Sequence, residues 1–267
     1  MKRAIFHYKI SEVVPYIDWS YLLHAWGLTA GATAPAEEII SDAKKILREI
    51  GDKYCTHALF ALCKARGCDD DIIVEDIALP CLRQQHFQAD CPNICLSDFV
   101  SPYGDEIGIF ATTIDHALDT EYKDDPYRNL LTQTLADRLA EATASLLHLQ
   151  VRTQKKLWGY APDESLDIAE LLAEKNRGIR PAVGYPSLPD QSIIFTIDRI
   201  AHLDEIGMSL TSNGAMTPHA SVCGLMISHP KARYFAVGKI SEEQLDDYAK
   251  RRGIPTDEIR KFLAKNC

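Results

Sequence analysis

The sequence predicts one α+β domain over residues 1–267, with a mostly antiparallel sheet. Segments with strand-like and helix-like apolar periods alternate along the chain, but without the regular βαβ rhythm of a parallel sheet. No low-complexity linker or internal repeat divides them. The chain is 46% hydrophobic and 25% charged, which is typical of a globular protein with a sizeable core.

The N-terminal half is expected to begin with a strand and to continue with helices. Residues 1–10 alternate loosely and predict an edge strand, and a glycine separates two expected helices over 36–50 and 54–66. A short strand is expected at 72–74, after an acidic turn. The apolar run 107–114 predicts a buried strand.

The longest helix is expected over residues 127–158, which contain no glycine or proline. Leucines and alanines recur there at spacings of three and four and form one apolar face. A polar row lies beside that face and consists of Asp137, Glu141, Ser145 and His148. A solvated helix surface explains such a row, and a ligand-facing surface is the alternative.

The C-terminal part is expected to contain short elements. A helix over 165–176 precedes a proline-rich segment, and Asp190 caps a further helix that runs to residue 205. The remaining expected elements are strands at 209–216 and 220–228 and helices at 241–252 and 256–264. The helix at 241 begins with a capping box.

Residues 180–190 are the most distinctive stretch of the chain, with three prolines and one glycine. Proline fixes φ and removes a backbone donor, so this segment cannot be a helix interior. We expect it to lie poorly in a core, because its free carbonyls need water or a ligand. Arg180 offers a planar donor fork for a carboxylate or phosphate, and Tyr185 offers a ring with a polar tip. The pattern predicts a binding loop, and a structural crossover loop is the alternative.

Asp18 is a lone acid inside an aromatic and aliphatic run, Val13–Ser20. Aspartate is a preferred residue at the start of a helix, where its side chain accepts a bond from a free backbone N–H. The cap is therefore the favoured interpretation of Asp18. A placed functional carboxylate is the alternative.

Charge and hydropathy exclude several classes of function. A net charge of −9 argues against a nucleic-acid-binding protein. No apolar run reaches the roughly 20 residues that span a bilayer, and the N-terminus does not have the pattern of a secretory signal. We therefore expect a cytoplasmic protein that binds neither nucleic acid nor a membrane.

Eight cysteines raise the question of a metal or disulfide site. They are Cys55, Cys63, Cys68, Cys81, Cys91, Cys95, Cys223 and Cys267. None of them forms a C-x-x-C pair, and the shortest spacing is Cys91-x-x-x-Cys95. Zinc sites usually show paired short spacings. Structural thiols in a reducing compartment are therefore favoured over a zinc or redox site, and no metal site is expected.

Seven blocks of the sequence, in order and over nearly the whole chain, form a distinctive set. They are 16–19, 95–100, 135–141, 158–162, 178–186, 228–230 and 246–249. They include Tyr-Ile-Asp-Trp at the first position and Arg-Pro-Ala within the proline-rich segment. Together these blocks resemble the activation domain of cobalamin-dependent methionine synthase, a domain that binds S-adenosylmethionine.

The resemblance implies a C-shaped α+β domain with a twisted sheet and flanking helices, whose concave face holds S-adenosylmethionine. The residues to which the family's contacts carry over are Asp18, Glu141, Arg180, Ala182, Gly184, Tyr185 and Tyr234. Arg180 is expected to bind the carboxylate of the ligand, with Glu141 and Asp18 near its ammonium group. Backbone near Ala182 is expected to contact the adenine. Tyr185 is the implied catalytic residue, because it would face the cobalt of a bound corrin.

The resemblance also implies a reaction, reductive methylation. Cobalamin in the inactive cobalt(II) state receives one electron from a flavodoxin or a similar donor. The resulting cobalt(I) then takes the methyl group from the sulfonium of S-adenosylmethionine. The protein would supply positioning and electrostatics. Since no cobalamin-binding portion is present, we expect a stand-alone subunit that acts on a methionine synthase lacking its own activation domain and has little activity alone. The alternatives are a regulatory protein that binds S-adenosylmethionine without methyl transfer, and a ligand-free interaction module.

Three positions depart from the family pattern. Gln191–Ile194 replace a His-Thr-Glu-Lys sequence, Thr217-Pro218-His219 replace Trp-Pro-Gly, and Phe235 replaces a tyrosine. The surface that faces the corrin is therefore expected to differ, with Tyr185 and His219 at the contact. A basic patch near the C-terminus is expected to receive an acidic flavodoxin, and it consists of Lys250, Arg251, Arg252, Arg260, Lys261 and Lys265.

Overall fold

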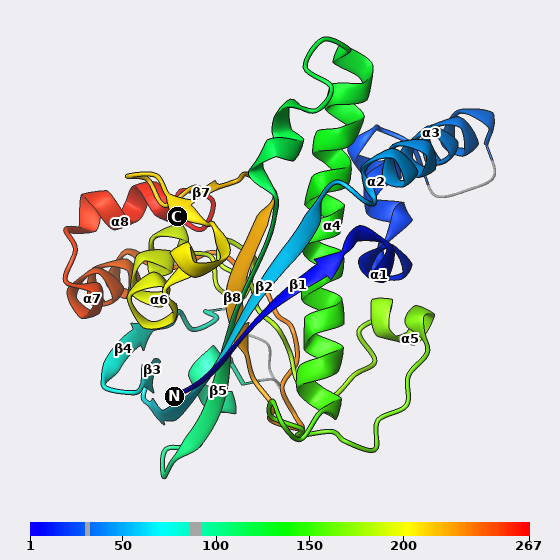
Figure 1. Ribbon diagram of the computed structural model, residues 1–267. Coiled ribbons are helices and arrows are strands. Elements are labelled where there is room, and N and C mark those ends of the chain that lie inside the picture. Colours follow the sequence, from blue (N-terminus) through cyan, green and yellow to red (C-terminus); the bar gives the residue numbers. More distant parts are fainter. Residues whose placement is uncertain (30–32, 86–91) are drawn as a thin grey trace.

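A six-stranded sheet forms the centre of the computed structural model, which describes residues 1–29, 33–85 and 92–267 (Figure 1). Its order is β4-β3-β2-β5-β8. Strand β1 also pairs with β2, on the same edge as β3: β1 pairs with the first part of β2 and β3 with its last part. All of these pairs are antiparallel, which confirms the predicted class. The strands are β1 (Lys2–Lys9), β2 (Cys55–Cys68), β3 (Asp71–Val74), β4 (Ile77–Pro80), β5 (Asp105–Ile114) and β8 (Ser221–Met226).

Strand β2 is the longest strand, and the helix predicted over 54–66 is wrong. Its alternate side chains enter two different cores: Phe60 and Leu62 pack on one face of the sheet, and Leu59 and Ala61 on the other. Because both faces are buried, the apolar residues form a continuous run without the alternation that marks a half-exposed strand. Alanine-rich composition then favours a helical interpretation.

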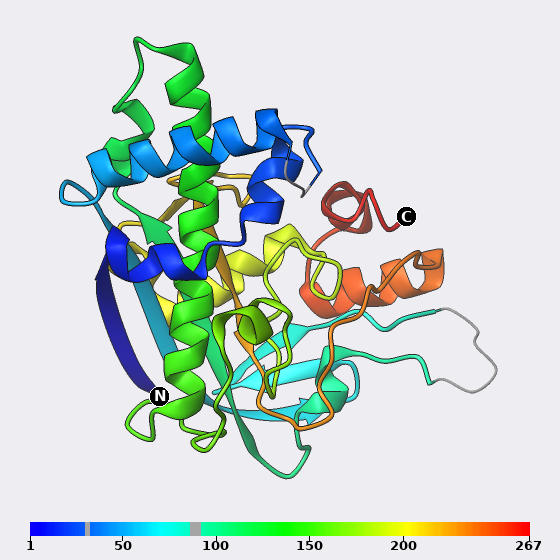
Figure 2. The ribbon, with the colours of Figure 1, turned by 90° about the vertical axis from the view of Figure 1, so that its right-hand side faces the viewer.

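One face of the sheet is covered by helices from the first half of the chain. Helix α4 (Pro126–Thr153) crosses this face, and α1 (Ile10–Val13), α2 (Trp19–Ala25) and α3 (Ala34–Ile50) pack around it (Figures 1 and 2). The hydroxyl of Thr112 on β5 donates to the carbonyl of Ala140 on α4 at 2.9 Å. Helix α4 ends at Thr153, five residues before the predicted end, because the chain becomes extended at the next residue.

The opposite face carries shorter elements. Helix α6 (Ile194–Ala201) and 3₁₀ turns at Leu96–Phe99 and Leu203–Ile206 pack there in a second core. Asp190 caps the 3₁₀ turn Gln191–Ile193, and α6 follows directly, so the expected helix from 190 to 205 is divided into three parts. A third, smaller cluster holds α7 (Glu242–Arg252) and α8 (Thr256–Phe262).

Several short elements differ from their expected bounds. The helix expected at 165–176 is one short helix, α5 (Ile168–Leu172), and strand β4 was not anticipated. The strand expected at 209–216 is reduced to β6 (Ser209–Leu210), which pairs with β7 (Met216–Thr217). The two C-terminal helices and the edge strand at the N-terminus are confirmed within two residues.

The proline-rich segment lies along the free edge of β8. Ile179 exchanges two backbone hydrogen bonds with Ile227, and the carbonyl of Pro181 accepts from the N–H of Leu225 at 2.9 Å. The N–H of Val183 donates to the carbonyl of Cys223 at 2.8 Å. The expectation that this segment would lie poorly in a core is therefore wrong. An edge position needs hydrogen bonds on one side only, and proline is tolerated there.

Neither a membrane span nor a metal cluster is found within 1–29, 33–85 and 92–267. No helix there is both long and apolar enough to cross a bilayer. No three histidine, cysteine, aspartate or glutamate side chains there lie together as metal ligands would. Seven of the cysteines are free thiols, and Cys91 lies outside the described residues.

Gly224 permits the close approach of the proline-rich segment to β8. A Cβ atom at this position would lie 2.2 Å from the carbonyl oxygen of Pro181, so the segment would have to move. We expect Gly224→Ala to lower the free energy of unfolding by about 3 kcal/mol or more, measured by urea denaturation.

Gly207→Ala is the matched control, because a Cβ there would meet no atom within 4 Å and only the positive φ of 78° would be strained. That strain costs about 1–2 kcal/mol. If Gly224→Ala cost no more than Gly207→Ala, the contact with Pro181 would not hold the segment in place.

Candidate functional site

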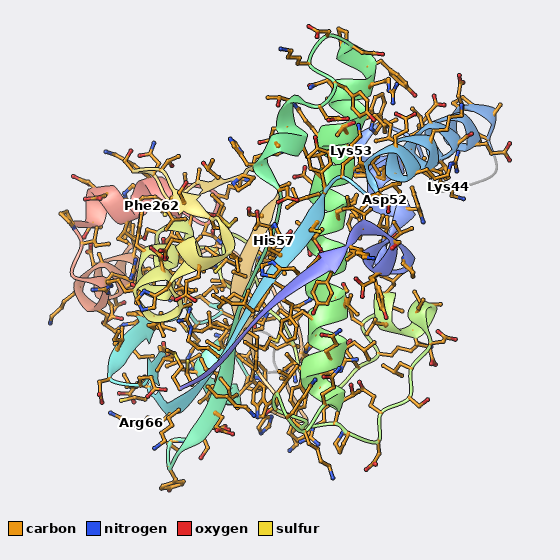
Figure 3. The ribbon with its side chains drawn as sticks, in the orientation of Figure 1. Lys44, Asp52, Lys53, His57, Arg66 and Phe262 are labelled. Carbon is orange, nitrogen blue, oxygen red and sulfur yellow. The ribbon has the colours of Figure 1, made fainter. Side chains whose placement is uncertain are left out.

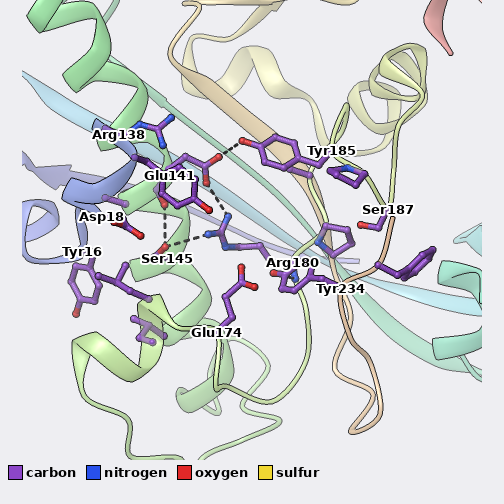
Figure 4. Close-up of a pocket in the computed structure, with 18 of the residues that line it drawn as sticks. Tyr16, Asp18, Arg138, Glu141, Ser145, Glu174, Arg180, Tyr185, Ser187 and Tyr234 are labelled. Carbon is purple, nitrogen blue, oxygen red and sulfur yellow. Dashed lines mark hydrogen bonds and ion pairs between the residues drawn. The ribbon is translucent and has the colours of Figure 1, made fainter. Parts of the chain in front are cut away.

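A cavity of about 620 Å³ opens between α4, α5 and the proline-rich segment (Figure 4). This volume suits a ligand of the size of a nucleoside. The polar side chains that line it are Tyr16, Asp18, Tyr21, Arg138, Glu141, Ser145, Glu174, Arg180, Tyr185, Ser187 and Tyr234. Apolar walls come from Ala142, Leu171, Leu172, Pro181, Ala182, Pro186, Phe235 and Ala236.

The polar row on α4 separates into three environments. Glu141 and Ser145 line the cavity, as the ligand-facing alternative predicts. His148 is only 3% exposed and hydrogen-bonds to the hydroxyl of Tyr160 at 2.8 Å. Asp137 lies outside the cavity lining, with an oxygen 3.7 Å from Nε2 of His219. The ligand-facing interpretation therefore holds for Glu141 and Ser145 and the solvated one for Asp137, whereas His148 is buried.

Arg180 is the central cation of the cavity. Its Nη1 lies 3.3 Å from a carboxylate oxygen of Glu141, and Nη2 donates to the hydroxyl of Ser145 at 3.2 Å (Figure 4). The guanidinium carbon lies 5.8 Å from the ring centre of Phe110, within the range of a cation–π contact. Burial acts to lower the pKa of Arg180, but the neighbouring acids, Glu141 first, outweigh it and raise that pKa.

Two tyrosines stand at the mouth of the cavity. The hydroxyl of Tyr185 donates to the second oxygen of Glu141, and the hydroxyl of Tyr234 accepts from the backbone N–H of Arg180 at 2.9 Å. Both remain partly exposed, Tyr185 at 49% and Tyr234 at 40%. Burial raises the pKa of both phenols, and Glu141 raises that of Tyr185 further. Both tyrosines are therefore neutral at physiological pH.

Gly184 shapes the turn that carries Tyr185. Its φ is +82°, and its N–H donates to the carbonyl of Leu188 at 2.8 Å. A side chain there would also meet the amide oxygen of Gln191 at 2.6 Å. Gly184 is not among the residues that line the cavity, so in this structure it acts on the site through Tyr185.

Asp18 combines the two interpretations that the sequence left open. Its carboxylate accepts from the backbone N–H of Ser20 at 2.9 Å and so caps α2. The same residue lines the cavity, beside Tyr16 and facing Glu141 (Figure 4). The cap therefore holds an acid at the cavity wall.

The chain resembles one family over almost its entire length. The family described as the activation domain of vitamin B12 dependent methionine synthase matches residues 9–253. The chain belongs to this family. Among solved structures it is similar to the MetH reactivation domain bound to AdoHcy, with 34% sequence identity and a TM-score of 0.93 over 100% of this chain and 90% of that one. The expected family and fold are thus confirmed.

This activation domain has a third acid in its cavity that the sequence analysis missed. Glu174 follows α5 in a left-handed conformation with φ of 54°, which is uncommon for a residue other than glycine. Its carboxylate points toward Arg180 (Figure 4). Arg138, the second cavity arginine, was missed as well. Glu174 lies outside the seven family blocks, and Arg138 lies inside block 135–141 but was not among the expected contacts, because the placement of both depends on how α5 and α4 are arranged around the cavity.

The departures from the family pattern lie in three places. Phe235 lines the cavity of this activation domain, and the side chain of Gln191 donates to the carbonyl of Gly214 at 2.9 Å. His219 lies 3.5 Å from Asp119 as well as near Asp137. The contact of His219 with a corrin stays a prediction.

The basic patch expected near the C-terminus is largely neutralised. Arg251 pairs with Asp71 and Asp247, and Arg252 with the buried Asp190. Arg260 pairs with Glu242 through two nitrogens. Only the lysines of the set form no ion pair within the described part of the chain. A strong docking field at this position is therefore not supported.

The raised pKa of Glu174 predicts how the stability of the protein depends on pH. Burial raises this pKa above its usual value of 4.5, against the lowering effect of Arg180. A carboxyl with a raised folded pKa ionises at lower pH in the unfolded chain, so ionisation penalises folding above that pH. We expect Glu174→Gln to raise the melting temperature of the ligand-free protein near pH 7, by an amount that shrinks toward pH 4.

Thermal unfolding followed by circular dichroism at both pH values measures this effect. Asp163→Asn removes an exposed carboxyl outside the cavity and serves as the control. A lower melting temperature of Glu174→Gln near neutral pH would mean that the carboxylate is favourably paired in the ligand-free protein.

Proposed function

We propose that this activation domain binds S-adenosylmethionine in the cavity and presents its methyl group to cobalamin carried by methionine synthase. The observation that carries the proposal is the pairing of Arg180 with Glu141 at the centre of the cavity. The bound AdoHcy of the similar MetH structure supports it, because AdoHcy is what S-adenosylmethionine becomes when it loses the methyl group.

The two ends of the Arg180–Glu141 pair match the methionyl end of the ligand. A guanidinium binds a carboxylate through two parallel hydrogen bonds, and a carboxylate binds an ammonium group. A zwitterion that enters the cavity can therefore take over both partners of the existing pair. Ser145, which now accepts from Arg180, lies within the same network and can hold the guanidinium in place during the exchange.

The total charge of the cavity favours S-adenosylmethionine over its product. Three carboxylates, from Asp18, Glu141 and Glu174, face two guanidiniums, from Arg138 and Arg180, so the lining has a formal charge of −1. S-adenosylmethionine carries a net charge of +1 through its sulfonium, whereas AdoHcy is neutral. The excess acid of the lining therefore attracts the methyl donor more than the product.

The mouth of the cavity is suited to contact with a second, flat group. Tyr185 and Tyr234 expose ring surface there, and the hydroxyl of Tyr185 is held by Glu141. When cobalamin is bound at this mouth, it supplies the cobalt centre that accepts one electron and the methyl group. The domain orients the sulfonium toward the mouth and surrounds it with fixed charge, which is a positioning role.

Two partner proteins complete the proposed reaction. The 267-residue chain would act on cobalamin held by a methionine synthase polypeptide that lacks its own activation domain, with flavodoxin or a similar donor supplying the electron. A cytoplasmic location stays a prediction from the sequence. The competing possibility is a protein that binds S-adenosylmethionine for regulation and transfers no methyl group.

Arg180→Ala tests the ligand site. We expect it to weaken S-adenosylmethionine binding by about 2–5 kcal/mol, because the ligand carboxylate and Glu141 would both lose their partner. Arg180→Lys should restore only part of the affinity, since an ammonium group lacks the planar fork. Isothermal titration calorimetry measures both variants. Unchanged affinity in Arg180→Ala would place the ligand elsewhere.

Methyl transfer is tested by mixing the purified chain with a methionine synthase lacking its activation domain in the cobalt(II) state, S-adenosylmethionine and reduced flavodoxin. The spectrum of methylated cobalamin should form only when this chain is present. Tyr185→Ala should slow its formation, while Tyr103→Ala, a 98% exposed tyrosine away from the cavity, should not. Tight ligand binding without any methylated cobalamin would favour the regulatory function.

A further inference from the structure

Two histidines face each other across the first two strands, away from the cavity. His7 on β1 and His57 on β2 are directly opposite in the antiparallel register. Their Nδ1 atoms lie 2.7 Å apart, and the rings meet at 75° with centroids 4.9 Å apart. Side chains alternate between the faces of a strand, so His57 shares the face of Leu59, opposite to α4. His7 is exposed, and Figure 3 labels His57 on this part of β2.

Asp115 determines which nitrogen of His57 carries the proton. Nε2 of His57 lies 2.9 Å from one oxygen of Asp115, and the other oxygen accepts from the backbone N–H of Cys55 at 2.7 Å. The backbone bond holds the carboxylate in position. A carboxylate can only accept, so the hydrogen-bond network assigns the proton of neutral His57 to Nε2. The lone pair on Nδ1 of His57 then points at Nδ1 of His7.

We propose that His7 and His57 form a binding site for a divalent transition-metal ion of the zinc type. Imidazole nitrogens suit Zn²⁺, Cu²⁺ and Ni²⁺, and a histidine that binds a metal commonly donates its other N–H to a carboxylate, as His57 does to Asp115. Without metal, the Nδ1 hydrogen of His7 lies between the two nitrogens and is donated to the lone pair of His57. When a metal ion takes this place, neutral His7 carries its hydrogen on the exposed Nε2 instead, so that both Nδ1 lone pairs face the metal.

The geometry requires only a small adjustment. Two nitrogens bound to zinc at about 2.0–2.1 Å in a tetrahedral arrangement lie roughly 3.3 Å apart, so the rings must separate by about 0.6 Å. The exposure of His7 permits this movement and leaves room for water as the remaining ligands. Since no third protein ligand gathers here within the described chain, we expect weaker binding than in a closed structural zinc site.

A metal bound here would join β1 to β2 at a sheet edge. The helices α1, α2 and α3 lie between these two strands in sequence, so the metal would cross-link the two ends of the segment that carries these helices. It would stabilise the folded state without touching the cavity, because neither histidine is among the cavity residues. The site is thus independent of the proposed function.

The experiment adds Zn²⁺ to the full chain labelled with ¹⁵N at histidine, after alkylation of the exposed thiols Cys68 and Cys267. Of the nine histidines, only His7 and His57 should show the Nδ1 shift of metal ligation. No shift at these two residues up to about 1 mM zinc, or shifts only at other histidines, would overturn the proposal.

Calorimetry with zinc provides the second readout. His7→Ala and His57→Gln should lower the affinity at least tenfold, and Asp115→Asn should lower it by about 10–100-fold by releasing the ring of His57. His24→Ala, an exposed histidine on α2, is the matched control and should bind as the wild type does. Wild-type affinity in His7→Ala would assign the zinc to an adventitious surface site.

Discussion

The close approach of the proline-rich segment to the edge of β8 determines the position of the whole candidate site. Backbone hydrogen bonds from Ile179, Pro181 and Val183 hold the segment against β8, and the absence of a side chain at Gly224 leaves room for it. Prolines stiffen the path, since each fixes one backbone angle. Arg180 thereby projects from a hydrogen-bonded edge rather than from a free loop.

Helix α4 supplies the opposite wall, and the two walls meet through charge. Arg180 and Glu141 are both largely removed from solvent, with side chains only 16% and 22% exposed. A pair in such a position gains little net stability, because the desolvation of both groups offsets their attraction. Glu174 adds a third acid, which is exposed, has a raised pKa and takes a left-handed backbone conformation. The site accordingly concentrates unfavourable features that the proposed zwitterionic, positively charged ligand would relieve.

The centre of β2 and its first residues have different roles. Its centre is buried on both faces, between the helical layer and the second core. Its first residues include the partly buried His57, which contacts His7 on β1 and Asp115 at the end of β5. The candidate cavity and the histidine pair therefore lie on opposite faces of the same sheet. Each is positioned by that sheet, and the two share no residue.

The sequence by itself determined the family, the antiparallel α+β class, the long helix and the central charged residues of the cavity, Asp18, Glu141 and Arg180, together with Ala182, Tyr185 and Tyr234. Those features depend on local spacing and on motifs that lie close together in the chain. Only the tertiary structure decided that 55–68 is a strand, because burial on both faces removes the alternation that identifies strands. It also placed the proline-rich segment along the edge of β8 and Glu174 and Arg138 in the cavity, since these outcomes depend on contacts between elements distant in sequence.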